Sequence, residues 1–173
     1  MSITSQQRSL LKSIAEYEDL LNTLTEEEFM RSPAEGVWSY SEVYSHIFQA
    51  NLGSLIAIEK CIAGTGIESH KRIHWMAWLI LFFGRFPPGK IKAPERVAAM
   101  VSKISTEEAK NLIVKFKKRL SELAPRVNKA SPAQTIKHPR LGLLNASYWF
   151  RFIEVHTLHH ARQLQRIQKM LNS

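Results

Sequence analysis

The sequence predicts an all-α fold, a four-helix bundle, on three observations. Four long segments repeat apolar residues at intervals of three and four, the period of a helix with one buried face. Three Ser/Thr-x-x-Glu capping boxes mark points where helices begin. Alternation of the kind that marks strands occurs nowhere over a useful length. Because the chain has 173 residues, 45% of them hydrophobic, we expect one bundle domain over residues 1–173.

The first long helix is expected over about residues 5–23, where apolar residues follow helical spacing. The capping box at residues 25–28 then opens a short helix that ends before Pro33. A second capping box, at residues 39–42, starts the second long helix. This helix is expected to run to about Ala63, where a glycine-containing turn ends it.

The third long helix begins at the capping box of residues 105–108 and ends near Pro125. The fourth extends over about residues 145–170. About 42 residues, 64–105, separate the second and third helices, and a structureless loop of that length is uncommon. The apolar run at residues 74–83 therefore predicts an extra helix inside this crossover. A crossover this long lets the second and third helices run parallel.

The run at residues 75–83 contains only apolar residues. A membrane-spanning helix needs roughly 20 such residues, so this run is too short to cross a bilayer. We expect it to be buried against the bundle or in a homodimer, and the dimer is favoured because four bundle helices already supply one core. Contact with a membrane surface is the alternative, since Lys71, Arg72 and Arg85 flank the run.

The net charge of +9 raises the question of nucleic-acid binding. The basic residues are spread along the chain, and the densest cluster, residues 115–119, places its lysines outside the apolar stripe of the third helix. No recognition-helix, RNP-like or zinc-finger pattern is present, so we expect no nucleic-acid partner.

The single cysteine, Cys61, excludes an internal disulfide and is expected to be a core thiol. The first residues lack the apolar segment of a signal peptide, so we expect a cytoplasmic protein.

Two histidines four residues apart, His156 and His160, fall on the apolar stripe of the fourth helix. The stripe consists of Trp149, Ile153, His156, His160, Leu164, Ile167 and Leu171. Residues four apart on a helix have Cβ atoms roughly 5–6 Å apart, so both rings can bind one metal ion. Buried polar rings need partners, and a metal ion is one such partner. A third ligand must then come from elsewhere in the chain.

His46 is the best candidate for the third ligand. It lies two turns into the second helix, in line with the small residues Ala50, Gly53 and Ala57, which leave room around an imidazole. The alternative for His46 is a core histidine hydrogen-bonded to an oxygen atom. Three neutral imidazoles leave one position open on a tetrahedral ion, the arrangement of catalytic zinc sites. Zinc is the expected divalent ion, with nickel or iron as alternatives.

The remaining histidines are expected outside the metal site. His159 is offset from His160 by about 100° around the helix, so we expect it to hydrogen-bond a carboxylate or to line the pocket rim. The surroundings of His70 and His74 indicate exposure. His138 precedes the last helix in a loop, where a turn role is favoured over a position above the site.

Groups that would support catalysis are harder to identify. Glu154, Gln49 and Gln163 are candidates to orient the imidazole rings. A general base is hard to name, because Asp19 is the only aspartate and lies on the first helix. No HExxH motif is present, which disfavours a metalloprotease.

Two motifs resemble those of the DinB-like superfamily. Residues 38–46 are similar to its W-S-x-x-E-x-x-x-H motif, and residues 156–160, His-Thr-Leu-His-His, are similar to its H-x-x-H-H ending. Residues 138–144 resemble an HP-x-x-G-x-L segment of one subgroup. The resemblance covers most of the chain and is specific at the two histidine motifs. The unusually hydrophobic insertion at residues 74–86 departs from the family pattern.

The resemblance implies a four-helix bundle with a divalent metal site formed by His46, His156 and His160. The family includes thiol S-transferases that use bacillithiol or mycothiol and a mycothiol-dependent isomerase. The expected function is therefore a metal-dependent thiol S-transferase or hydrolase acting on a small electrophile, with a low-molecular-weight thiol as a candidate cosubstrate. The alternatives are a non-catalytic metal- or ligand-binding protein and a dimeric structural protein whose histidines only hydrogen-bond.

Overall fold

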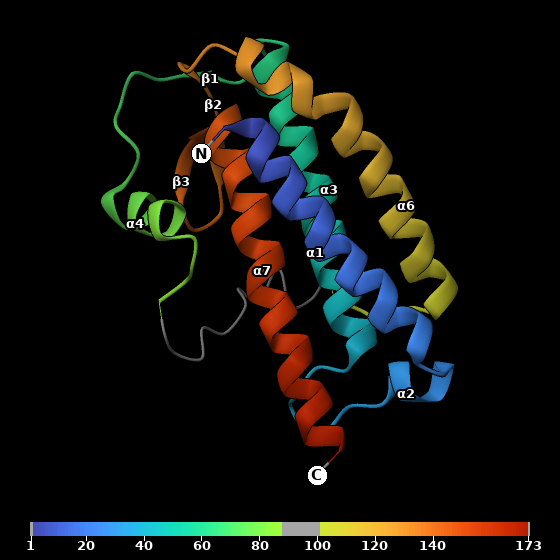
Figure 1. The fold of residues 1–173 in the computed structure, drawn as a ribbon. Coiled ribbons are helices and arrows are strands. Elements are labelled where there is room, and N and C mark those ends of the chain that lie inside the picture. The colour runs from blue at the N-terminus through green and yellow to red at the C-terminus, as the bar shows by residue number, and fades with distance from the viewer. Residues whose placement is uncertain (1, 88–100, 173) are drawn as a thin grey trace.

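The computed structural model describes residues 2–87 and 101–172. Within these ranges, four long helices pack side by side as a bundle, which confirms the predicted architecture (Figure 1). They are α1 (Ile3–Thr23), α3 (Tyr40–Ile62), α6 (Thr106–Leu123) and α7 (Ala146–Leu171). Their apolar stripes meet in one core, in which the aromatic rings of Tyr17, Tyr44 and Phe48 are fully buried.

Shorter elements lie between the bundle helices. They are α2 (Glu26–Met30), β1 (Ile67–Glu68), α4 (Trp75–Phe83), the 3-10 helix η1 (Ala124–Lys129), β2 (Gln134–His138) and β3 (Gly142–Asn145). Helix α2 is the short helix expected after the first capping box, and α4 is the extra helix expected in the crossover. No helix in the described part of the chain is long and apolar enough to cross a membrane.

The three strands form a small antiparallel sheet, in the order β1-β2-β3, which the sequence did not predict. Thr135 of β2 pairs with Ile67 of β1 on one side and with Asn145 of β3 on the other. The strands are two to five residues long, too short for an alternating pattern to be recognised. The sheet adjoins the start of α7, where Trp149 Nε1 donates a hydrogen bond to the carbonyl of Ile136 at 3.3 Å.

All three predicted capping boxes form. In each box, the Ser or Thr hydroxyl accepts a hydrogen bond, at 3.1–3.3 Å, from the backbone N–H of the Glu three residues later. The Glu carboxylate in turn accepts a hydrogen bond at 2.7–2.8 Å from the backbone N–H of that Ser or Thr. The boxes begin at Thr25, Ser39 and Ser105. They bind N–H groups that the helix leaves unpaired, and so fix where α2, α3 and α6 start.

Hydrogen bonds between elements fix the directions of the helices. The Ser41 hydroxyl, at the start of α3, accepts from the N–H of Ile104 and donates to its carbonyl, both at 2.6 Å. Since Ile104 immediately precedes α6, the starts of α3 and α6 lie together and the two helices run parallel. The predicted crossover geometry is therefore present. In contrast, Tyr44 near the start of α3 donates to the carbonyl of Tyr17 in the second half of α1, at 2.7 Å, so α1 runs antiparallel to α3.

Helix α4 is apolar on every side, but within residues 2–87 and 101–172 the chain buries only one side of it. Ala77, Ile80 and Leu81 are buried, and α4 packs against α7. Five large side chains are instead 45–63% exposed: Trp75, Met76, Trp78, Phe82 and Phe83. The expectation that the whole run is buried is therefore wrong for the single chain, because a helix turns only one face to its neighbour. Burial of the remaining face in a homodimer stays a prediction.

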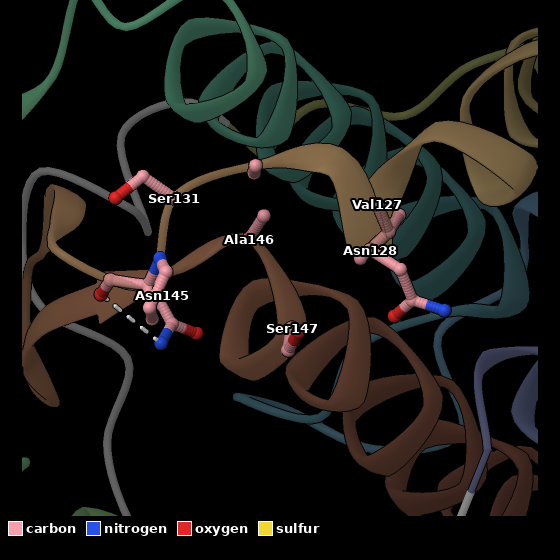
Figure 2. A pocket seen from close by; sticks show the side chains of 8 residues that line it. Val127, Asn128, Ser131, Asn145, Ala146 and Ser147 are labelled. Carbon is pink, nitrogen blue, oxygen red and sulfur yellow. Dashed lines mark hydrogen bonds between the residues drawn. The ribbon is translucent and has the colours of Figure 1, made fainter.

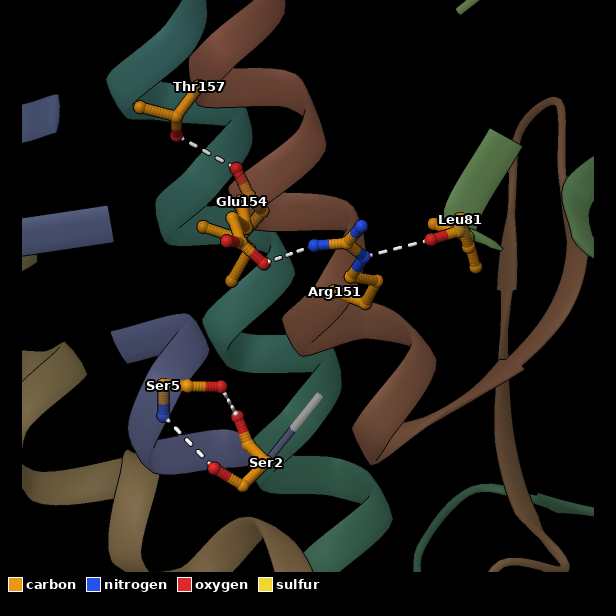
Figure 3. A network of polar contacts seen from close by, with 7 residues as sticks. Ser2, Ser5, Leu81, Arg151, Glu154 and Thr157 are labelled. Atoms are coloured by element: carbon orange, nitrogen blue, oxygen red, sulfur yellow. Dashed lines mark hydrogen bonds and ion pairs between the residues drawn. The ribbon is translucent and has the colours of Figure 1, made fainter. Parts of the chain in front are cut away.

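One arginine connects α4 to the bundle. Arg151 on α7 donates from Nε to the carbonyl of Leu81 at 2.8 Å, and its Nη1 pairs with Glu154 at 2.5 Å (Figure 3). Gly84, which ends α4 with φ +67°, lies so close that a Cβ atom there would come within 2.7 Å of Arg151 Nη2. The side chains of Arg151 and Glu154 are only 16% and 2% exposed. This buried ion pair therefore anchors the inner side of α4.

Substitution of Arg151 is expected to destabilise the protein. Arg151→Ala leaves the buried Glu154 carboxylate without this partner, which should lower the free energy of unfolding by about 3 kcal/mol. Denaturant titration followed by circular dichroism measures the change. Lys117→Ala is the matched control, because its ion pair with Glu18 is 42% and 32% exposed and should contribute less than about 1 kcal/mol. Equal effects of the two substitutions would contradict the anchoring role of Arg151.

Candidate metal centre

Three histidines from two helices converge in the bundle interior. His46 comes from α3, and His156 and His160 come from α7. The Nε2 atom of His156 lies 3.2 Å from His46 Nε2 and 3.1 Å from His160 Nε2. One ring nitrogen from each of the three lies within 4.8 Å of the others, so the cluster could hold one metal ion. The structure thus brings together the three residues that the sequence singled out.

Local structure explains why these rings meet. Helix α7 places His156 and His160 one turn apart on its buried stripe, and each is only 7% exposed. The capping box at Ser39 fixes the start of α3 and therefore the face that His46 presents. Helices α3 and α7 run antiparallel and form the most extensive helix pair in the bundle. Their shared face therefore positions the site.

A chain of hydrogen bonds orients the His156 ring. The hydroxyl of Thr157 donates its single hydrogen to the carbonyl of Ile153 at 2.8 Å. The same oxygen must therefore accept the bond from Asn51 Nδ2, at 3.0 Å. This turns Asn51 Oδ1 toward His156 Nδ1, at 3.2 Å. An amide oxygen only accepts, so Nδ1 of His156 carries the ring proton, and the lone pair of its Nε2 faces the other two histidines.

The other two rings are held differently. His160 Nδ1 lies 2.7 Å from Gln163 Oε1, so it also donates, and its Nε2 is left as an acceptor. His46 packs against the indole of Trp38, with ring centroids 5.2 Å apart. Phe152 stacks on His156 at 5.1 Å and 18° between planes. Aromatic side chains thus restrict the rings where hydrogen bonds do not.

Burial keeps the cluster neutral. Desolvation is the main cause that lowers the pKa of His46 to about 4 and the pKa of His160 to about 3. The fully buried His156 has its pKa lowered well below 6.5 for the same reason, reinforced by the neighbouring histidines. Near pH 7 all three imidazoles are therefore in the neutral form that binds metals.

Two of the three nitrogen separations fit a metal ion. Zinc–nitrogen bonds of about 2.0–2.1 Å in a tetrahedral site place ligand nitrogens about 3.3 Å apart. The observed Nε2 separations of 3.2 and 3.1 Å are close to that value. Imidazole nitrogens of this kind suit zinc, nickel and iron alike. Without an ion, the Nε2 lone pairs of His156 and His160 would face each other at 3.1 Å, which is unfavourable for buried acceptors.

The other histidines lie outside the cluster, as expected. His138 takes the turn role, because its Nδ1 accepts from the N–H groups of Arg140 and Leu141, both at 3.1 Å. Its ring also packs on that of Phe152, with centroids 4.5 Å apart, and Phe152 is the residue that stacks on His156. His159 lies next to His160, with centroids 5.1 Å apart, and contacts Phe86 at 5.0 Å.

Two further histidines and the cysteine also match expectation. His70 and His74 are exposed, and His70 Nε2 lies 3.6 Å from an oxygen of the exposed Glu68. Cys61 is buried at the end of α3, and burial raises the pKa of its thiol, so it is a core thiol. None of these side chains belongs to the three-histidine group.

Of the three candidates to orient the rings, only Gln163 contacts a cluster histidine through a hydrogen bond shown here. Glu154 instead pairs with Arg151, and Gln49 donates to the hydroxyl of Ser45 at 3.0 Å. Asn51, which orients His156, was missed by the sequence reasoning. Its place at helical spacing between the apolar residues Phe48 and Leu55 of α3 was the available indication, because an amide on a buried stripe needs partners.

One hollow away from the cluster offers little chemistry. It lies between η1 and the start of α7 (Figure 2) and has a volume of about 110 Å³. It is lined by Val127, Asn128, Ala130, Ser131, Pro132, Asn145, Ala146 and Ser147. These residues include no titratable side chain, so this hollow has no acid, base or metal ligand.

Comparison with known proteins identifies the family. The family model described as the DinB superfamily matches residues 9–164, most of the chain. The chain belongs to the DinB superfamily. Among curated proteins, none matches this DinB chain significantly.

Two solved structures share the fold of this DinB protein at low sequence identity. One is YfiT from Bacillus subtilis, described as a probable metal-dependent hydrolase with an unusual four-helix bundle topology. It is 10% identical, with a TM-score of 0.63 over 98% of this chain and 87% of YfiT. The other is a mycothiol-dependent maleylpyruvate isomerase, 13% identical, with a TM-score of 0.65 over 99% of this chain and 66% of the isomerase. Both similarities support the bundle architecture.

The role of Asn51 gives a testable prediction. Asn51→Leu removes the acceptor that fixes the His156 ring while keeping a side chain of similar size. Metal affinity should fall by about 10–100-fold, the usual effect of losing such an orienting partner. A competition titration with a chromophoric chelator measures the affinity. Asn128→Leu, at an exposed position on η1, is the control and should change nothing. Unchanged affinity in Asn51→Leu would refute the orienting role.

Proposed function

We propose that this DinB protein is a metal-dependent enzyme that acts on a small electrophile by S-transfer or hydrolysis. His46, His156 and His160 would hold one divalent ion, with zinc as the expected metal and nickel or iron as alternatives. The observation that carries the proposal is the convergence of three neutral imidazoles, two of which have their Nδ1 bound to an amide oxygen. Such an arrangement leaves the Nε2 atoms of His156 and His160 available to one ion, and His46 Nε2 lies 3.2 Å from that of His156.

The protein's own residues would bind the ion, orient the imidazole rings and shield them from water. The three Nε2 atoms would bind the ion, and Asn51 and Gln163 hold the rings of His156 and His160 in the ligating orientation. Trp38 and Phe152 cover the sides of His46 and His156, which keeps bulk water from these rings. A divalent ion with three histidine ligands supplies Lewis acidity at its open position, enough to lower the pKa of water to about 7 or to stabilise a thiolate.

A non-catalytic metal- or ligand-binding role is the second candidate function. It is favoured by the composition of the cluster, which among the described residues contains histidines and no carboxylate. Glu154, the buried carboxylate on the same helix, is already paired with Arg151. The catalytic proposal therefore assigns no general base and places the reactivity at the open metal position.

The number of domains and the oligomeric state are also matters of proposal. We propose that residues 1–173 form one domain, since the four bundle helices share a single core. For the exposed face of α4, the sequence favoured a homodimer over a membrane surface, and the exposed basic residues around the helix reverse this preference. A small-molecule substrate suits this site, because His156 and His160 are each only 7% exposed and a compact group is needed to approach them.

Metal content provides the first test. His46→Ala and His156→Ala each remove one of three ligands, so the purified variants should lose most of the metal found in the wild type. Inductively coupled plasma mass spectrometry measures the metal per chain. His70→Ala is the control, because His70 is exposed and outside the cluster. Full metal content in both cluster variants, with intact helical circular dichroism, would disprove the assignment.

Turnover provides the second test. Zinc-loaded protein is incubated with bacillithiol or mycothiol and monochlorobimane, so that the thiol sulfur bonds to carbon and chloride leaves. Thiol-dependent product formation that His156→Ala loses supports S-transfer. Hydrolysis of an activated ester without thiol, lost in the same variant, supports the hydrolase form. A metal-loaded protein inactive in both assays would favour the non-catalytic alternative.

A further inference from the structure

We propose that the outer face of α4 docks on an anionic lipid surface. This face, called the α4 outer face below, consists of Trp75, Met76, Trp78, Leu79, Phe82 and Phe83. The inference is independent of the proposed metal chemistry, because it rests on the surface of α4 and not on the histidine cluster.

Helix α4 has no polar side chain on any side. A helix that is apolar all round is ordinarily buried in a core or in lipid. Its inner residues, Ala77, Ile80 and Leu81, satisfy this rule against the bundle. On the outer face, Trp75 and Phe82 are each 63% exposed and Phe83 is 59% exposed. Large apolar side chains are unfavourable in water, and an exposed apolar patch of this kind ordinarily marks a contact surface.

The helix is held so that the outer face points away from the bundle. Arg151 bonds the carbonyl of Leu81, and Gly84 lies close against the same guanidinium, which fixes the inner side to α7. On the outer face, the rings of Trp78 and Phe82 stack with centroids 4.8 Å apart. Figure 1 shows α4 at the periphery of the molecule, outside the four bundle helices. An approaching flat surface can therefore reach it.

The charges around α4 favour an anionic partner. Lys71 and Arg72 precede the helix, Arg85 follows it, and all three are exposed. Between Glu68 and Glu95 the sequence contains no acidic residue. Basic residues at both ends of a short apolar helix are typical of helices that lie in the interface of a membrane. Tryptophan rings also favour this interfacial depth.

The same charges disfavour a second copy of this chain. A symmetric dimer through the α4 outer face would bring the flanking Lys71, Arg72 and Arg85 of both copies to one interface. Each chain carries a net charge of +9, so such an interface would bring like charges together. An anionic membrane surface instead attracts each nearby basic residue.

Docking would also place the metal centre near the lipid surface. Phe86 follows the end of α4 by three residues and packs on His159, whose ring centroid lies 5.1 Å from that of His160. The α4 outer face and the edge of the histidine cluster are thus connected by a short piece of chain.

Vesicle binding tests the proposal. The full-length protein is sedimented with sucrose-loaded vesicles of phosphatidylcholine alone or of phosphatidylcholine and phosphatidylglycerol in equal parts. Binding is expected only to the anionic vesicles and should weaken with salt. Trp78→Ser/Phe82→Ser should reduce the partition coefficient by about tenfold or more. Lys71→Glu/Arg72→Glu should reduce it by a similar factor.

Matched controls separate docking from general stickiness. Leu11→Ser/Val114→Ser replaces apolar residues that are 39% and 63% exposed on α1 and α6 and should bind as the wild type does. Lys110→Glu/Lys115→Glu tests charge reversal on the exposed side of α6 in the same way. The proposal is overturned by absence of binding, by equal binding to neutral vesicles, or by equal loss in the controls. It is also overturned if light scattering shows a dimer that Trp78→Ser/Phe82→Ser dissociates while vesicles do not bind.

Discussion

The contact between α3 and α7 is the constraint on which the rest of the site depends. Two buried imidazoles, His156 and His160, meet the half-buried ring of His46 there, and burial of polar rings is unfavourable unless each has a partner. Asn51 and Gln163 satisfy the Nδ1 atoms of His156 and His160, which leaves their Nε2 atoms as acceptors beside His46 Nε2. A metal ion is the partner that satisfies all three at once, so the need for hydrogen-bond partners and the proposed chemistry have the same physical origin.

The surrounding bundle supports this contact through buried polar groups. Thr157 connects the side chains of Asn51 and Tyr17. Its hydroxyl accepts a hydrogen bond from Asn51, and its carbonyl accepts one from the hydroxyl of Tyr17 at 2.9 Å. Tyr44 then donates to the carbonyl of Tyr17, so α1, α3 and α7 are bonded to one another close to the site. Burial raises the pKa of both tyrosines well above the ordinary value of 10, which keeps them protonated as donors. The bundle thus holds the ring orientation by hydrogen bonds as well as by apolar packing.

Much of this arrangement could be predicted from the sequence. Local chemistry determines helix starts, so the capping boxes at Thr25, Ser39 and Ser105 were recognisable, and the helical period placed His156 and His160 on a buried stripe. Asn51 escaped prediction because its role depends on which side chain faces it across α7. The β1-β2-β3 sheet escaped because strands this short carry no pattern of their own. The exposure of α4 depends on packing against α7, which its uniformly apolar sequence could not specify.

The most direct test of the central claim is anomalous diffraction from crystals of zinc-loaded protein. Data collected on either side of the zinc absorption edge locate the ion without reference to chemistry or activity. The account predicts one peak, about 2.0–2.1 Å from the Nε2 atoms of His46, His156 and His160. Ligation through Nδ1 of His156, or a zinc peak elsewhere with these three rings hydrogen-bonded only to protein, would contradict it.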